Sequence, residues 1–426
     1  MVYKKRIIED IIKEKLEYMG GVSIKGPKWC GKTETAKIYK KDMIDLSDDE
    51  IQDNIYFQEK KYSKLFDKEK PLLIDEWQLY PAIWNSVKTY IDNAKVPGQF
   101  ILTGSSTPIE DEKLHPGTGR ISLIQMKTMT LFESGESNGS VSLKDILNGN
   151  ANLDNIKSRV TFEEIAYLVA RGGWPNIFNI KNEYALKIAK EYINNLCETD
   201  ISKYDGEKRN PMLAKAILKA YARNVHTVNA NTTIFEDIKE IYGEVSDTTI
   251  YNYVNAFKRL FIFEEIPAWN PNIRSKTVIQ ESPKKSFIDP SIAVAALETS
   301  PEELLNDTKT LGLLFENLVY RDLSVYADTL GGYIRHYRDR LGLKCDFVAH
   351  FENGKYGLIE VKLGASKIKE AREHLIDLKN KIIESGKKEE NKHLKAPDFL
   401  MIITGSNTCM KTDDGIYIIP IDCLKN

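Results

Sequence analysis

The chain has 426 residues, which is more than one ordinary hydrophobic core accommodates, so we expect two to four domains. Hydrophobic residues make up 42% and charged residues 29%, a balance that is typical of folded globular proteins and excludes general disorder. The formal net charge of -2 excludes a global positive field, so any contact with nucleic acid or anionic lipid has to be local.

The first twenty residues predict an amphipathic helix that ends at a glycine pair. Apolar side chains recur there at helical spacing between charged ones, at Ile7, Ile8, Ile11, Ile12 and Leu16. The segment lacks the apolar stretch of a signal peptide, and 18 apolar residues never run together, so we expect no membrane span. The five scattered cysteines form no C-x-x-C pair, which favours a reducing cytoplasm over a disulfide framework or a zinc site.

A glycine-rich loop follows the predicted strand VSIKG and precedes a helix that begins near Lys32. Its sequence, GPKWCGKT, matches the Walker A pattern, in which backbone amides and a helix N-terminus surround phosphate groups. Lys32 is expected on the β- and γ-phosphates of ATP, and Thr33 is expected to bind Mg²⁺. The residues predicted to contact the nucleotide are Gly26, Pro27, Lys28, Trp29, Cys30, Gly31, Lys32, Thr33 and Glu34.

Two later apolar runs, PLLIDE at 71–76 and QFILTGSS at 99–106, predict buried strands of a parallel sheet. Ligands bind at the carboxyl ends of such strands, which is where Asp75 and Glu76 stand. Asp75 is predicted to join the Mg²⁺ shell, and Glu76 to polarise the attacking water as the catalytic base. From the next strand Ser105, with Thr103 or Ser106 as alternatives, either senses the γ-phosphate or serves only in a turn.

Arg120, in the segment GTGRI, is a candidate for stabilising charge on the transferred phosphoryl group. It could act within its own chain or from a neighbouring subunit of a homo-oligomer. The alternative is a solvated surface arginine, because position in the chain does not locate such a residue.

Beyond residue 133 the pattern changes several times. The Gly-, Ser- and Asn-rich stretch 134–158 predicts a linker or an exposed insertion, and a mostly helical region follows to about residue 204. Residues 232–269 read as helix, glycine turn, helix and strand, which is similar to a winged helix-turn-helix. That motif either contacts DNA or only joins two domains. From about residue 312 the pattern is helix, three strands, helix and strand, an α/β unit of its own.

Six segments together resemble the prokaryotic AAA-superfamily ATPases that carry a C-terminal domain of unknown function with a restriction-endonuclease-like core: GPKWCGKT, LLIDE, FILTGSS, GR at 119–120, TLFE near Leu131 and RGGWP at 171–175. The resemblance implies an α/β fold with an AAA-like P-loop parallel-sheet core, a helical lid, a winged helix-turn-helix and a nuclease-like α/β domain. The expected boundaries are 1–135, 136–204, 205–290 and 291–426. Lys28 departs from the arginine expected after Gly-Pro.

The resemblance directs attention to a second constellation of the PD-(D/E)XK nuclease type. Such sites need carboxylates to hold Mg²⁺ and a lysine near the attacking water. The candidates are Glu316 on a helix, Asp346 on one strand, and Glu360 with Lys362 on the next. Alternation places Glu360 and Lys362 on one face of their strand. An accidental E-x-K on an exposed strand is the alternative.

The predicted function is that of a cytoplasmic, Mg²⁺-dependent ATPase whose nucleotide state positions the C-terminal domain on a partner, with DNA as the expected partner. One hypothesis makes the protein an ATP-driven nuclease. The other makes it a nucleotide-gated switch or DNA-binding regulator with an inactive nuclease-like domain. A purely structural protein with a dead nucleotide site is disfavoured, because Lys32, Thr33, Asp75 and Glu76 are all present.

Overall fold

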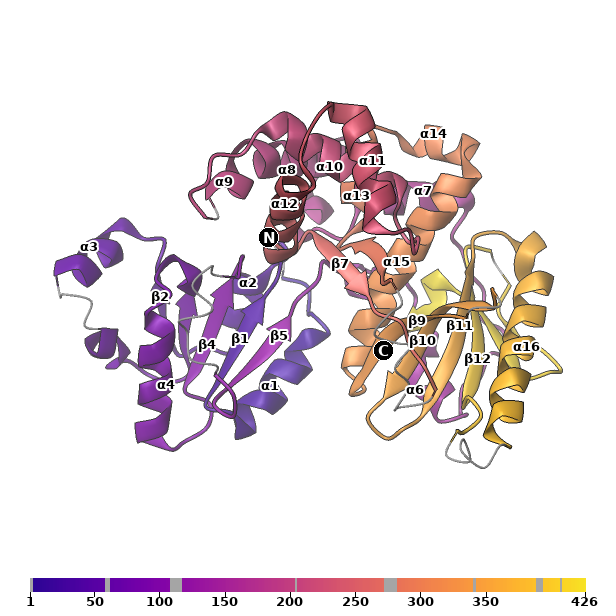
Figure 1. Ribbon diagram of the computed structural model, residues 1–426. Coiled ribbons are helices and arrows are strands. Elements are labelled where there is room, and N and C mark those ends of the chain that lie inside the picture. Colours follow the sequence, from indigo (N-terminus) through magenta and orange to yellow (C-terminus); the bar gives the residue numbers. More distant parts are fainter. Residues whose placement is uncertain are drawn as a thin grey trace.

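The computed structural model describes residues 3–57, 62–107, 117–203, 205–271, 282–339, 342–387, 394–406 and 408–426. Figure 1 shows the N-terminal sheet and its helices at the left of the picture and a second sheet at the right. A group of helices lies across the top of both. The chain passes from the first sheet through these helices to the second sheet.

The N-terminal unit is built on a five-stranded parallel sheet of order β2-β3-β4-β1-β5. Its strands are β1 (Gly21–Lys25), β2 (Asp42–Asp45), β3 (Leu72–Asp75), β4 (Phe100–Gly104) and β5 (Ile121–Gln125). Its helices are α1 (Ile8–Tyr18), α2 (Lys32–Lys37), α3 (Asp49–Phe57) and α4 (Ile83–Ala94). The predicted N-terminal helix and the predicted strands at 71–76 and 99–106 are confirmed.

Helices cover both faces of this sheet, which explains why its strands read as continuous apolar runs. Leu73 belongs to the core beneath α1 and α2, whereas its neighbours Leu72 and Ile74 belong to the core beneath α4. Each strand therefore buries side chains on both sides, and the carboxyl ends of β1, β3 and β4 are left together at one edge.

The middle region is mainly helical and includes one antiparallel pair of strands, β7 and β8. It contains α5 (Leu131–Ser134), β6 (Val141–Ser142), α6 (Leu143–Leu147), α7 (Phe162–Arg171), α8 (Asn182–Asn195), α9 (Ile201–Lys203), α10 (Pro211–Arg223), α11 (Asn231–Tyr242), α12 (Asp247–Arg259), β7 (Phe263–Ile266), β8 (Lys284–Phe287), α13 (Pro290–Leu297) and α14 (Pro301–Asn306). The predicted succession of helix, glycine turn, helix and strand is present as α11, Gly243, α12 and β7.

The C-terminal unit contains the predicted succession of helix, three strands, helix and strand. Its elements are α15 (Thr308–Asp328), β9 (Gly332–Arg338), β10 (Lys344–Phe351), β11 (Tyr356–Lys362), α16 (Ile368–Gly386), β12 (Phe399–Thr404), β13 (Met410–Lys411), β14 (Ile416–Pro420) and β15 (Leu424–Lys425). The sheet order is β13-β14-β12-β11-β10-β9. Strands β9 to β11 are antiparallel neighbours, whereas β11, β12 and β14 run parallel.

The interpretation of residues 134–158 as a linker or exposed insertion is wrong for residues 141–147. Strand β6 pairs in parallel with β15 at the opposite end of the chain, with Val141 opposite Leu424. Val141 and Leu143 are both buried in the large hydrophobic core that also contains Leu424. Glycine, serine and asparagine surround these few apolar residues in the sequence, so composition concealed a segment that the end of the chain buries.

One hydrophobic core runs through the middle region and the C-terminal unit, from Leu131 on α5 to Leu424 on β15. These two parts of the chain are therefore packed as one body rather than joined by a loose linker. None of the helices in the described ranges combines the length and low charge that crossing a bilayer requires.

Candidate functional site

The glycine-rich loop connects the carboxyl end of β1 to the first turn of α2. Gly31 has φ 98°, a backbone conformation that side chains disfavour. A Cβ atom on Gly26 would lie 2.2 Å from the carbonyl oxygen of Met126. Both glycines of the predicted Walker A pattern are thus required by the backbone path of the loop.

Lys32 and Thr33, the residues predicted to contact phosphate and metal, begin α2 directly after the glycine-rich loop. The Lys32 ammonium donates to the carbonyl oxygens of Gly26 at 3.0 Å and of Pro27 at 2.8 Å. The Thr33 hydroxyl donates to the Asp75 carboxylate, at 2.9 Å from Oδ1 and 3.1 Å from Oδ2. The loop and the end of β3 therefore meet at the predicted edge of the sheet.

Asp75 is a buried carboxylate surrounded by hydroxyl donors. Thr103, at the end of β4, also donates to Asp75 Oδ1. Burial raises the pKa of Asp75, although the two threonine hydrogen bonds act in the opposite direction. A hydroxyl and a carboxylate in contact are hard oxygen ligands of the kind that Mg²⁺ prefers, so Thr33 and Asp75 fit a Mg²⁺ ion bound with a nucleotide.

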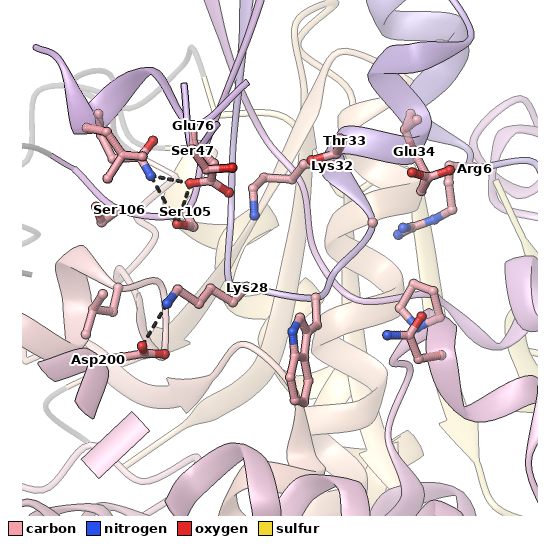
Figure 2. A pocket seen from close by; sticks show the side chains of 18 of the residues that line it. Arg6, Lys28, Lys32, Thr33, Glu34, Ser47, Glu76, Ser105, Ser106 and Asp200 are labelled. Atoms are coloured by element: carbon pink, nitrogen blue, oxygen red, sulfur yellow. Dashed lines mark hydrogen bonds and ion pairs between the residues drawn. The ribbon is translucent and has the colours of Figure 1, made fainter. Parts of the chain in front are cut away.

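Glu76 forms a small polar cluster with Ser105 and Gln78 (Figure 2). The Ser105 hydroxyl donates to Glu76 Oε2 at 2.9 Å, and the Gln78 amide donates to both Glu76 and Ser105. Glu76 has φ 53° and ψ 43°, so its backbone turns away from the strand direction directly after Asp75. The predicted base and the predicted serine are therefore neighbours, and Gln78 is a partner that sequence reasoning missed.

These groups line a cavity of about 1090 Å³. Its walls come from distant parts of the chain: the N-terminal residues Tyr3, Lys4 and Arg6, the glycine-rich loop, the segment with Pro175, Asn176 and Phe178, and the residues Asp200, Lys203 and Asp205. Lys28 pairs with Asp200 at 2.7 Å across the cavity, as Figure 2 shows. The middle region therefore contacts the loop directly through its residues around 176 and 200.

Arg6 is a further functional candidate that sequence reasoning missed. Its buried guanidinium donates to the carbonyl oxygen of Cys30 at 2.7 Å, to that of Lys127 at 2.9 Å and to Glu133 Oε1 at 3.0 Å. Glu133 in turn accepts the backbone N–H groups of Ile7 and Thr130. Arg6 thus ties the glycine-rich loop to the beginning of α5, and no local pattern marks it because its partners lie far away in sequence.

Two of the predicted site residues, Cys30 and Arg120, do not line the cavity. The Cys30 side chain is buried with its sulfur 3.7 Å from the Met126 carbonyl oxygen, so Cys30 contributes its main chain to the loop. Arg120 pairs with Asp92 at 2.6 Å, and its carbonyl oxygen accepts from Gly21 at the beginning of β1. Arg120 therefore stands at the opposite edge of the sheet and does not reach the cavity of its own chain. A role in a neighbouring subunit stays a prediction.

The second predicted constellation also comes together. The Asp346 carboxylate accepts from the backbone N–H of Val361 at 2.9 Å and from the Lys362 ammonium at 3.2 Å. Lys362 also donates to Glu360 Oε2 at 2.5 Å. As alternation predicts, Ile359 and Val361 belong to the other face, where they join the large core.

Glu316 reaches this group through an unpredicted residue, Lys284 on β8. The Lys284 ammonium lies 2.6 Å from Glu316 Oε1 and 3.8 Å from Asp346 Oδ1. Glu316 Oε1 is also 3.1 Å from His226 Nδ1. Within the part of the chain that the structure describes, no group of three or more His, Cys, Asp and Glu side chains is arranged to hold a metal ion. The predicted metal role of these carboxylates does not fit this arrangement.

Electrostatics in this second group follow from burial and from the two lysines. Burial raises the pKa of Glu360 to about 8, and the charge of Asp346 acts in the same direction. Burial also disfavours an ionised Asp346, but Lys284 and Lys362 hold the pKa of Asp346 well below its ordinary value. Burial lowers the pKa of His226, although the neighbouring Glu316 acts in the opposite direction.

Three family models match consecutive parts of the chain. Residues 20–134 match an AAA domain, residues 162–303 match a domain of unknown function (DUF8612), and residues 311–424 match a domain of unknown function (DUF4143). The first match supports an AAA-type ATPase core in residues 20–134, with ATP binding and hydrolysis by the N-terminal unit. The matches do not test the predicted winged helix and nuclease-like fold, which stay predictions.

Several solved structures are similar to this chain. A Walker-type ATPase of Pyrococcus abyssi is 14% identical and aligns over 69% of this chain and 96% of its own length, with a TM-score of 0.42. AMPPCP-bound DnaA from Aquifex aeolicus is 15% identical over 58% of this chain and 86% of that one, with a TM-score of 0.26. A DNA replication initiation factor is 14% identical over 72% of this chain and 92% of that one, with a TM-score of 0.26. No curated protein sequence matches the chain.

Proposed function

We propose that the protein hydrolyses ATP with Mg²⁺ in the cavity beside the glycine-rich loop. The observation that carries this proposal is the meeting of Lys32, the Thr33–Asp75 pair and the Ser105–Glu76 pair at one edge of the parallel sheet. These are a cation for phosphate, oxygen ligands for a metal and a base for water. The AAA domain match at residues 20–134 supports the same assignment.

The residues of the site have two roles, which are to bind the phosphates with Mg²⁺ and to position the attacking water. The loop amides and the N-terminus of α2 bind the phosphates, and Lys32 exchanges its two carbonyl partners for phosphate oxygens. Thr33 and Asp75 hold Mg²⁺, which neutralises charge on the phosphates when it is bound. Glu76, held by Ser105 and Gln78, orients the attacking water and accepts its proton.

Replacing Glu76 with glutamine tests this division. General-base catalysis contributes roughly 10² to 10⁴ in rate, so E76Q should lose about that factor in ATP turnover while it still binds ATP. The matched control is Glu298→Gln, which removes an exposed carboxylate paired with Lys219 away from the cavity and should leave turnover unchanged. Turnover by E76Q at the parent rate would contradict the assigned base.

We further propose that nucleotide state is transmitted to the middle region, which makes the protein a nucleotide-gated regulator. The specific support comes from two contacts between the loop and the middle region. Lys28 forms an ion pair with Asp200. The ring of Trp29 packs edge-on against that of Tyr192 on α8, with 5.8 Å between the ring centroids. A phosphate group bound at the loop competes for Lys28 and so changes this contact. DNA is the proposed partner of the region around α11 and α12.

ATP turnover measured with and without double-stranded DNA tests the partner. A DNA-dependent change that weakens as salt rises would support DNA as partner, because phosphate contacts release counterions. Turnover that does not respond to DNA at low salt, together with no binding in a filter or anisotropy assay, would contradict it. Neither outcome affects the E76Q test, which needs no DNA.

A further inference from the structure

The second carboxylate cluster of this protein consists of Glu316 on α15, Asp346 on β10 and Glu360 on β11. The PD-(D/E)XK resemblance implies a divalent metal at this place. Two lysines occupy the cluster instead: Lys362 from β11 and Lys284 from β8. The two ammonium groups lie among the three carboxylates, where a metal ion would need the same oxygen atoms.

We propose that Lys284 is a built-in cation that takes the place of the divalent metal and keeps the second carboxylate cluster closed. Its ammonium lies 2.6 Å from Glu316 Oε1, 3.2 Å from the Asp346 carbonyl oxygen and 3.8 Å from Asp346 Oδ1. It therefore lies between the helix and the strand that supply the carboxylates. Its side chain is only 11% exposed, so water does not compete for these contacts.

One oxygen atom of each carboxylate in the cluster already accepts from a lysine ammonium. Glu316 Oε1 accepts from both Lys284 and His226. Asp346 Oδ2 accepts from the Val361 backbone N–H and from Lys362. Among the described residues, Glu360 Oε1 is the one carboxylate oxygen of the cluster that is buried without a hydrogen-bond partner. Mg²⁺ demands near-octahedral oxygen coordination, so it would have to displace the ammonium groups from Glu316 Oε1, Asp346 Oδ2 and Glu360 Oε2 in order to use these carboxylates.

Burial of Ser286 and His226 excludes a catalytic role for Glu316 in a Ser-His-Glu triad. The Ser286 hydroxyl lies 3.1 Å from His226 Nε2, and His226 Nδ1 lies 3.1 Å from Glu316, which is the order of a Ser-His-Glu triad. The side chain of His226 is 0% exposed, and Ser286 is 2% exposed and accepts from Asn317. A substrate does not reach this hydroxyl, so the chain of hydrogen bonds fixes the carboxylate that Lys284 binds.

Lys284 comes from the middle region and not from the unit that carries the carboxylates. Strand β8 is held by antiparallel pairing with β7, in which Lys284 lies opposite Ile266. The next residue, Lys285, pairs with Glu265 on β7 at 3.1 Å. The cluster is thus closed by a contact between two parts of the chain, and it stays closed while β8 keeps this position.

Mn²⁺ titration without nucleotide, followed by electron paramagnetic resonance of the free ion, tests the proposal. The parent protein should show no Mn²⁺ site that Asp346→Asn removes. Lys284→Met removes the competing positive charge and should gain one site, bound at least about tenfold more tightly than any Mn²⁺ site of the parent. Asp346→Asn in the K284M background should abolish that site. The matched control is Lys285→Met, which removes the adjacent buried lysine and should gain none.

Two results would overturn the proposal. One is Mn²⁺ binding by the parent that Asp346→Asn removes, because the cluster would then be open. The other is a folded K284M variant that gains no Mn²⁺ site. If K284M does not fold, Lys284→Gln keeps a hydrogen-bond donor without the charge, and the comparison of the parent with D346N still decides the question. Absence of nucleotide makes every outcome independent of ATP hydrolysis.

Discussion

Replacement of Arg6 with methionine should destabilise the N-terminal unit and weaken nucleotide binding together. The substitution keeps a long apolar side chain but leaves Glu133 without its cation, with a side chain only 1% exposed. Breaking a buried ion pair by removing one partner costs about 3 to 5 kcal/mol. The carbonyl oxygens of Cys30 and Lys127 lose their donor as well. We therefore expect a loss near the upper end of that range.

Urea denaturation measures the free energy of unfolding, and a fluorescent ATP analogue measures the dissociation constant. Each loss of about 1.4 kcal/mol in the free energy of nucleotide binding raises the dissociation constant about tenfold. Lys5→Met is the control, since Lys5 pairs with Asp10 on the surface with both side chains about 70% exposed. A double-mutant cycle with Glu133→Gln should return a coupling energy above about 1 kcal/mol. The role given to Arg6 would be refuted if the free energy of unfolding of R6M lay within about 1 kcal/mol of the parent value and the dissociation constant for the nucleotide were unchanged.

Three further substitutions test other parts of the fold. Gly172→Ala should cost at least about 2 kcal/mol in thermal or urea unfolding, because Gly172 has φ 75° and a Cβ would meet Asp289 Oδ1 at 2.4 Å. Gly119→Ala has a similar φ of 76° with open space around it, and should cost about 1 kcal/mol or less. Burial lowers the pKa of His336 to about 4, so the folded state resists the proton that the unfolded chain accepts near pH 6.5. Stability should therefore fall as pH drops from 6.5 to 4, by up to about 3 kcal/mol, and His336→Gln should remove that part of the pH dependence. An equal pH dependence in parent and variant would contradict this.

The grouping of these side chains beside the glycine-rich loop could be predicted because their patterns are local in the sequence. The glycines, Lys32 and Thr33 lie within one loop, and Asp75 with Glu76 end one apolar strand. Parallel strands bring their carboxyl ends to one edge, so two local patterns were enough to place these groups together. Arg120 belongs to no such pattern, so the sequence did not show whether it lies at the carboxyl ends or at the amino ends of the strands.

The long-range partners could not be predicted for the opposite reason. Arg6 meets Glu133 across 127 positions, and Lys284 meets Asp346 across 62. Neither residue belongs to a periodic or spaced motif, so nothing in the neighbouring sequence distinguishes it from a surface cation. The pairing of β6 with β15 was missed in the same way, because two-residue strands have no measurable alternation.

Lys32 and Lys284 make the same kind of contact with opposite consequences. Each ammonium is buried and bound to oxygen atoms of its own chain. The partners of Lys32 are neutral carbonyl oxygens beside a cavity of about 1090 Å³, so an anionic phosphate entering that cavity offers a stronger, charge-assisted bond. The partners of Lys284 include the carboxylate of Glu316, and an incoming metal would have to displace a charge-assisted bond in order to bind. The first lysine is therefore poised to exchange partners when ligand arrives, whereas the second holds its cluster shut against one.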